Sequence, residues 1–164
     1  MIEWASILVL AGCLIYAGVS DFRTMTIPNW CSVAIAIAYL PLAYAAGIPV
    51  TGILIHFGIG IGLFIVGALL FAGGIFGGGD TKLLAAAGIW FGLEYLGAYL
   101  VTIALLGGLL ALLTLGFRKY WSGRPGGPAL LWLNPPEGQA VGIPYGIAIA
   151  AAGFLLIPMM VTPG

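Results

Sequence analysis

The amino-acid sequence predicts an all-α protein that crosses a membrane about six times, with both termini outside. The 164 residues are 62% hydrophobic and only 6% charged, whereas a soluble domain carries about 25% charged residues. The mean hydropathy is +1.18, and the few charged positions separate long apolar segments. This composition excludes an ordinary soluble globule and a disordered chain. Five basic residues balanced by five acidic ones leave no basic surface for nucleic acid.

The first predicted helix covers residues 4–20. These 17 residues between Glu3 and Asp21 carry no charge, and about 20 apolar residues cross a bilayer. The chain starts without a positively charged region and without a convincing small-residue cleavage site. We therefore expect a retained helix and not a cleaved signal peptide.

The next uncharged segment, residues 24–79, is too long for one crossing. As a single helix its 56 residues would extend about 84 Å, whereas the hydrocarbon core is about 30 Å thick. Pro41 and Pro49 bracket a short connector, which predicts helices at 30–46 and 51–73. Two crossings return the chain to the same side, so Asp21 and Asp80 are expected in the same compartment.

The segment 83–117 carries a single charge, Glu94. A turn around residues 92–94 predicts a short helix at 80–92 and a longer one at 95–116. A Gly/Pro-rich loop at 117–142 and a last helix at 143–160 complete one membrane domain of residues 1–164.

The positions of the basic residues indicate which side of the membrane each connecting segment faces. With the N-terminus outside, all five lie on the cytoplasmic side, as the positive-inside rule requires. They are Arg23, Lys82, Arg118, Lys119 and Arg124. The 117–142 loop is then cytoplasmic, as are the segments around Asp21 and Asp80.

Asp21 and Asp80 are the candidate functional residues, because each lies where an apolar helix meets a loop. A carboxylate within a membrane is costly and indicates function by default. Arg23 and Lys82 each follow an aspartate by two residues, a spacing that does not bring side chains together on a helix. Pairs across helices, Asp21 with Lys82 or Asp80 with Arg23, remain open at this point.

Three segments carry recognisable motifs. Residues 77–80 read G-x-G-D, residues 21–29 read D-x-R-x-x-x-I-P-N, and residues 144–148 read P-Y-G-x-A. In this order they resemble the signatures of the type IV prepilin peptidases, which are intramembrane aspartic proteases. The positions that carry the resemblance around the two aspartates are Arg23, Pro28, Asn29, Gly77, Gly79, Lys82, Pro144, Tyr145 and Gly146.

The resemblance implies an endopeptidase in the cytoplasmic membrane of a prokaryote, with its active site facing the cytoplasm. Its substrate would be a pilin-like precursor that loses a short basic leader. Asp21 and Asp80 would be the catalytic residues, and no metal or other cofactor is implied. Longer relatives carry a Cys-x-x-Cys extension and methylate the new N-terminus. This chain resembles the short branch that processes Flp-type (tight-adherence) or archaeal pilins, so we do not expect methylation.

Two carboxyls that share one proton can activate water for peptide hydrolysis. The end of the first helix disfavours a carboxylate and the start of the fourth favours one. Asp21 is thus expected to hold the proton and Asp80 to act as base. Lys82 and Arg23 either tune this pair or anchor lipid headgroups, and His56 is assigned to packing or the interface. Trp121 and Trp132 are interpreted as interfacial anchors.

Two other functional classes remain open. A small transporter or channel subunit would place its aspartates on a proton or cation path. That function favours charges at mid-span or inverted repeats, and the sequence shows neither. A purely structural membrane scaffold would leave two aspartates on the same side, beside glycine hinges, unexplained.

Overall fold

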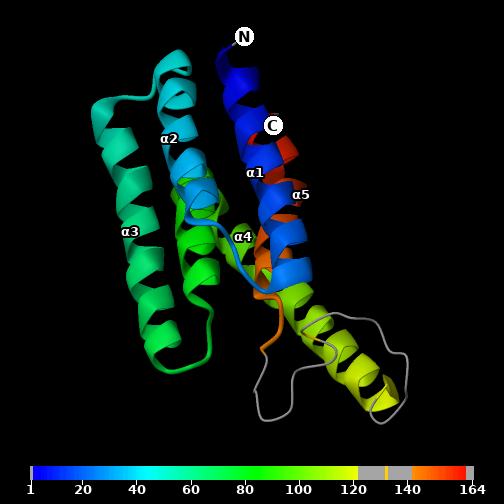
Figure 1. Cartoon of the computed structure of the whole chain (residues 1–164). Coiled ribbons are helices and arrows are strands. Elements are labelled where there is room, and N and C mark those ends of the chain that lie inside the picture. Colours follow the sequence, from blue (N-terminus) through cyan, green and yellow to red (C-terminus); the bar gives the residue numbers. More distant parts are fainter. Residues whose placement is uncertain (1, 122–131, 133–141, 162–164) are drawn as a thin grey trace.

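The computed structural model describes residues 2–121, 132 and 142–161, which form five helices and no strand. This confirms the all-α prediction. The predicted 117–142 loop falls largely outside the described residues, and its first part, 117–121, is helical. The helices are α1 (Ile2–Thr24), α2 (Asn29–Ala45), α3 (Val50–Ala72), α4 (Gly78–Trp121) and α5 (Tyr145–Val161) (Figure 1).

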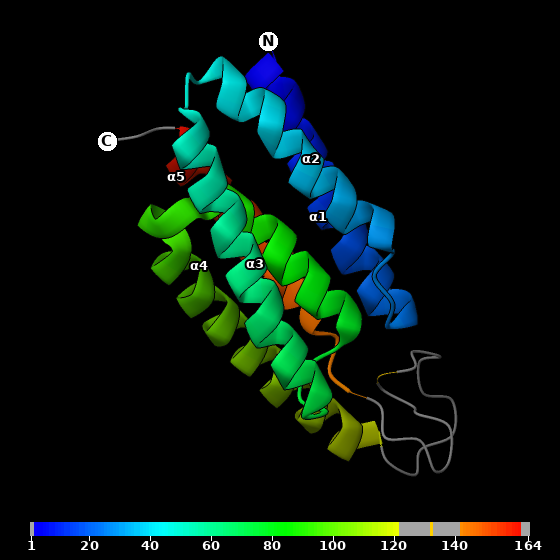
Figure 2. The same ribbon diagram turned by 90° about the vertical axis from the view of Figure 1, so that its left-hand side faces the viewer.

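Helix α4 is broken at Gly92, where φ is 55° and ψ is −166°. The chain reverses there (Figure 2): residues 78–91 form the first limb, and residues 93–121 form a second limb that runs back along the bundle. The turn lies where the sequence predicted it, but no loop separates the limbs. The two predicted helices are confirmed as the two limbs of α4, and the second limb extends five residues beyond the predicted end.

Among the described residues, three helical segments are long and apolar enough to span a membrane, namely Ile2–Thr24, Val50–Ala72 and Gly78–Tyr120. The chain is thus an integral membrane protein. The third segment has 43 residues and would extend about 65 Å if straight, but the reversal at Gly92 divides it into two limbs. Helices α2 and α5 have 17 residues each. Six crossings and the location of the termini remain predictions.

The helices place both aspartates at one end of the bundle. The end of α1, the end of α3 and the starts of α2, α4 and α5 lie toward the lower end in Figure 1. The start of α1 and the end of α5 lie toward the opposite end. Helix α4 packs against α2, α3 and α5, and α1 packs against α2 and α5. Asp21 and Asp80 are thereby brought to the same end, as the sequence predicted.

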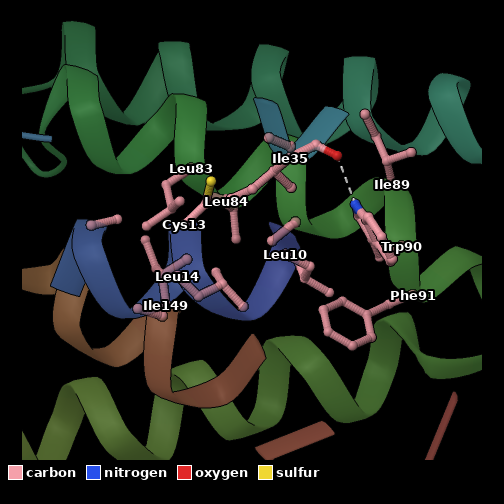
Figure 3. Close-up of a cluster of buried hydrophobic side chains, with 14 of the residues drawn as sticks. Leu10, Cys13, Leu14, Ile35, Leu83, Leu84, Ile89, Trp90, Phe91 and Ile149 are labelled. Atoms are coloured by element: carbon pink, nitrogen blue, oxygen red, sulfur yellow. Dashed lines mark hydrogen bonds between the residues drawn. The ribbon is translucent and has the colours of Figure 1, made fainter. Parts of the chain in front are cut away.

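The core is a layer of apolar side chains contributed by four helices (Figure 3). Leu14 of α1, Ile35 of α2, Leu83 of α4 and Ile149 of α5 are each fully buried. The indole Nε1 of Trp90 donates a hydrogen bond of 2.9 Å to the carbonyl oxygen of Ile35. The hydrogen bond and the surrounding core fix the first limb of α4, and with it Asp80, against α2.

Candidate active site

The turn between α1 and α2 positions the first aspartate. Helix α1 ends at Thr24, and Met25 then adopts a left-handed conformation with φ 55°. The hydroxyl of Ser20 donates to the carbonyl oxygen of Thr26 at 2.7 Å, which holds the turn closed. Pro28 precedes α2 in an extended conformation. Asp21 lies in the last turn of α1 and is 4% exposed.

The start of α4 positions the second aspartate. Asp80 lies in the first turn of α4 and is 8% exposed. The hydroxyl of the next residue, Thr81, lies 3.1 Å from the carbonyl oxygens of Gly67 and Gly77. These hydrogen bonds tie the first turn of α4 to α3. Sequence reasoning missed Thr81, whose only sequence signal is its position directly after the G-x-G-D motif.

Both aspartates line one pocket of about 220 Å³. Asp21 Oδ2 and Asp80 Oδ1 are buried and have no hydrogen-bond partner in the part of the chain that the structure describes. Two buried carboxyls that line one pocket cannot both ionise easily. The pocket is lined by Asp21, Met25, Thr26, Ile27, Asn29, Gly77, Gly78, Gly79 and Asp80.

The start of α5 provides backbone amides to both carboxyls. The backbone amides of Gly146 and Ile147 lie near Asp21, and those of Gly77 and Gly146 lie near Asp80. Amides at a helix N-terminus favour negative charge. The ends of α1 and α4 by themselves favour Asp21 as the proton holder. Because α5 also favours charge on Asp21, helix ends alone do not separate the roles of the two carboxyls.

The glycines of the motifs leave room for these carboxyls. A Cβ atom on Gly77 would lie 2.6 Å from Asp80 Oδ2, and one on Gly146 would lie 2.8 Å from Asp21 Oδ2. A Cβ on Gly79 would lie 3.1 Å from the Cβ of Ile27. A side chain at Gly77 or Gly146 would therefore displace a carboxyl, whereas one at Gly79 would press on Ile27 in the adjacent turn.

Lys82 joins the two aspartate motifs. Its Nζ donates a hydrogen bond of 2.8 Å to the Oδ1 of Asn29, the first residue of α2. The pairing of Lys82 with Asp21, which the sequence left open, is not the one observed. Arg23 is exposed and does not line the pocket.

The P-Y-G-x-A segment, residues 144–148, lies at the start of α5 and packs beside the aspartates. Pro144 is fully buried immediately before α5. The ring of Tyr145 packs against Phe76 with 5.7 Å between ring centroids. A Cβ on Gly107, in the second limb of α4, would lie 2.7 Å from that tyrosine ring. Tyr145 thus fills the space between α4 and the connector before Gly77.

Trp132 is a residue whose role the sequence did not reveal. Its Nε1 donates to the carbonyl oxygen of Phe22 at 2.9 Å, and the two rings lie 5.4 Å apart. The side chain is 7% exposed. The interpretation of Trp132 as an interfacial anchor is therefore wrong, because it packs against the turn that carries Asp21. The side chain of Trp121 lies outside the described residues.

His56 lies away from the aspartates, as predicted. Its Nδ1 lies 2.6 Å from the carbonyl oxygen of Ile89, in the last turn before Gly92. A carbonyl can only accept, so Nδ1 donates this hydrogen bond. The imidazole also stacks on Tyr39 with 4.9 Å between ring centroids. His56 is a packing residue that supports the break in α4.

Comparison with known proteins gave one finding. A family model described as the type IV leader peptidase family matches residues 8–115. This range includes Asp21 and Asp80 and ends before the segment that begins at Pro144. Neither the comparison with curated proteins nor that with solved structures found a match.

Proposed function

The chain belongs to the type IV leader peptidase family, and we propose that it acts as an aspartic endopeptidase on pilin-like precursors. It removes their short basic leader at the cytoplasmic face of a prokaryotic cytoplasmic membrane. The observation that carries this proposal is the shared pocket of Asp21 and Asp80, two buried carboxyls from segments that are distant in the sequence.

The two carboxyls act as one acid–base unit in this proposal. The ionised member removes a proton from water, and the protonated member donates a hydrogen bond to the scissile carbonyl oxygen. The proton belongs to the pair, which titrates as a unit. The backbone amide of Gly146 lies near both carboxyls and favours negative charge on the pair.

The arrangement supports a peptidase over a transporter or channel subunit. A path for protons or cations requires polar groups along the span. Asp21 and Asp80 instead lie together at one end of the bundle. The adjoining interior is filled by buried apolar side chains, which include Leu14, Leu83 and Ile149.

Cleavage of a pilin-like precursor with a basic leader, measured in detergent, tests the proposal. Wild-type protein should cleave the precursor, and Asp80→Asn should lose roughly 10³-fold or more of the rate, because one half of the acid–base unit is removed. Glu94→Gln is the matched control, since Glu94 is an exposed carboxyl beyond the break in α4. Absence of cleavage by the wild type, or equal loss in both variants, would contradict the proposed activity.

A further inference from the structure

Arg118 lies in the last turn of α4, and its side chain holds two segments that follow that helix in the sequence. Its Nε donates a hydrogen bond of 2.7 Å to the carbonyl oxygen of Trp132. Its Nη2 donates one of 2.8 Å to the carbonyl oxygen of Gly142. A guanidinium carries several N–H donors in a fixed plane, so it can hold two acceptors at once. Figure 1 shows the end of α4 toward the same end of the bundle as the end of α1 and the start of α5.

The first of the two segments reaches the end of α1. Trp132 donates from its Nε1 to the carbonyl oxygen of Phe22, the residue directly after Asp21. The last carbonyls of a helix have no partner within the helix, and Phe22 lies in the last turn of α1, which ends at Thr24. Trp132 therefore caps this turn from a distant part of the chain, and Arg118 holds the backbone of Trp132.

The second segment leads into the start of α5. Gly142 lies shortly before Pro144, which is fully buried. The backbone amide of Gly146, in the first turn of α5, lies near both aspartates. A Cβ atom on this glycine would lie 2.8 Å from Asp21 Oδ2, so α5 approaches that carboxyl closely. The hydrogen bond from Arg118 to Gly142 thus anchors the chain just before it enters the site.

We propose that Arg118 is a positioning residue for the candidate active site, which acts on the aspartates through Trp132 and Gly142. The inference rests on the proposed peptidase function. Arg118 is not among the residues that line the pocket, so its effect is on the position of the carboxyls. Both of its contacts lead to Asp21, one through the end of α1 and the other through the start of α5. Arg118 thereby fixes the two helices between which this carboxyl lies.

The alternative role for a basic residue at this place is contact with lipid headgroups, which depends on the charge alone. Lysine keeps the charge of arginine but lacks the planar arrangement of donors. Arg118→Lys therefore separates the two roles. The next residue, Lys119, is exposed and lies in the same turn, so Lys119→Gln is the matched control for removal of one positive charge.

The kinetics of precursor cleavage in detergent test the proposal. Arg118→Gln should lower kcat roughly 10- to 100-fold with KM nearly unchanged, because a displacement of a catalytic group by ~1 Å costs up to about 10²-fold. Arg118→Lys should lose nearly as much, and Lys119→Gln should keep the wild-type constants. A wild-type kcat in Arg118→Gln, full activity in Arg118→Lys, or an effect on KM alone would overturn the positioning role.

Trp132→Phe removes the indole donor and keeps an aromatic ring beside Phe22. It should lower kcat by no more than Arg118→Gln does, because the contact of Arg118 with Gly142 remains. The variant with both changes should be hardly slower than Arg118→Gln, since residues that act through one contact give non-additive losses. Losses that multiply in this variant, or a wild-type kcat in Trp132→Phe, would show that Arg118 does not act through Trp132.

Hydrogen–deuterium exchange of the detergent-solubilised protein gives a readout that does not depend on cleavage. Arg118→Gln should speed exchange in peptides that cover residues 20–26 and 142–147, and leave exchange in the first limb of α4 as in the wild type. Unchanged exchange in the first two peptides would overturn the positioning role and leave the peptidase function standing. Failure of the wild type to cleave, with the expected change in exchange, would instead reject the peptidase function. If Arg118→Gln exchanges rapidly throughout, kcat of Trp132→Phe decides the outcome.

Discussion

The glycines around the two carboxyls determine how closely the backbone approaches them. Gly77 and Gly146 leave no space for a Cβ atom beside Asp80 and Asp21. The variable position of the G-x-G-D motif is different. A Cβ on Gly78 would meet only the ring of Phe71, at an ordinary contact distance of 3.5 Å. The glycines of the motif are thus explained by the small space beside the carboxyls and not by a general need for a flexible backbone.

This difference predicts the outcome of two alanine substitutions. Gly146→Ala should lower kcat by about 10²-fold, because a displacement of a catalytic group by ~1 Å costs a factor of this size. Gly78→Ala, the control, should retain nearly full activity. Precursor cleavage by the two purified variants measures the effect. Wild-type kcat in Gly146→Ala would show that Gly146 does not set the position of Asp21.

The sequence indicated the two aspartates but not the residues that hold them. Asp21 and Asp80 stand out because carboxylates beside apolar helices are rare and costly. Thr81 and Trp132 act through contacts with Gly67 and Phe22. The second of these contacts joins residues 110 positions apart, and no local pattern encodes such a pairing.

At the scale of the helices, charged residues mark where the chain leaves the apolar region but not where a helix ends. Helix α1 was predicted to end at residue 20 and continues to Thr24, and its last turn carries Asp21. The Thr24 hydroxyl donates to the carbonyl oxygen of Ser20 at 2.9 Å, one turn earlier in the helix. The extra turn places Asp21 on a rigid element.

The break in α4 depends on Gly92. Its φ of 55° is unfavourable for other residues, and a Cβ there would lie 2.6 Å from the imidazole of His56. Gly92→Ala should therefore lower the free energy of unfolding by about 1–3 kcal/mol. Thermal unfolding in detergent measures this loss.

Gly97→Ala is the control for this substitution, because Gly97 lies in the same helix with no atom near its Cβ position. It should leave the unfolding temperature unchanged or slightly raised, since alanine favours a helix over glycine by about 1 kcal/mol. Equal unfolding temperatures for the two variants would show that the conformation at Gly92 is not required.

At the scale of the whole molecule, the sequence predicted which end of the bundle carries the aspartates but not how the helices pack. Counting passes between Asp21 and Asp80 was enough to place them together. Apolar residues cover most faces of these helices, and many large ones stay exposed in the structure, such as Leu8 and Leu105. No single apolar stripe therefore marks the packed face, and the central position of α4 could not be predicted.

The proposed orientation predicts the accessibility of two connectors. Ala46 and Ile75 are exposed residues between α2 and α3 and between α3 and α4. A membrane-impermeant maleimide should label Ala46→Cys in intact cells, and Ile75→Cys only after permeabilisation. The natural thiols, Cys13 and Cys31, are buried and provide a low background. The opposite labelling pattern would place the aspartates outside.

The central claim is that Asp21 and Asp80 act together on one water molecule, and a double-mutant comparison tests it most directly. The rate of precursor cleavage is measured for Asp21→Asn, Asp80→Asn and the variant that carries both changes. Residues that act as a unit give strongly non-additive losses. We predict that each single variant loses roughly 10³-fold or more and that the double variant is hardly slower than either. A wild-type rate in either single variant, or losses that multiply in the double variant, would contradict the claim.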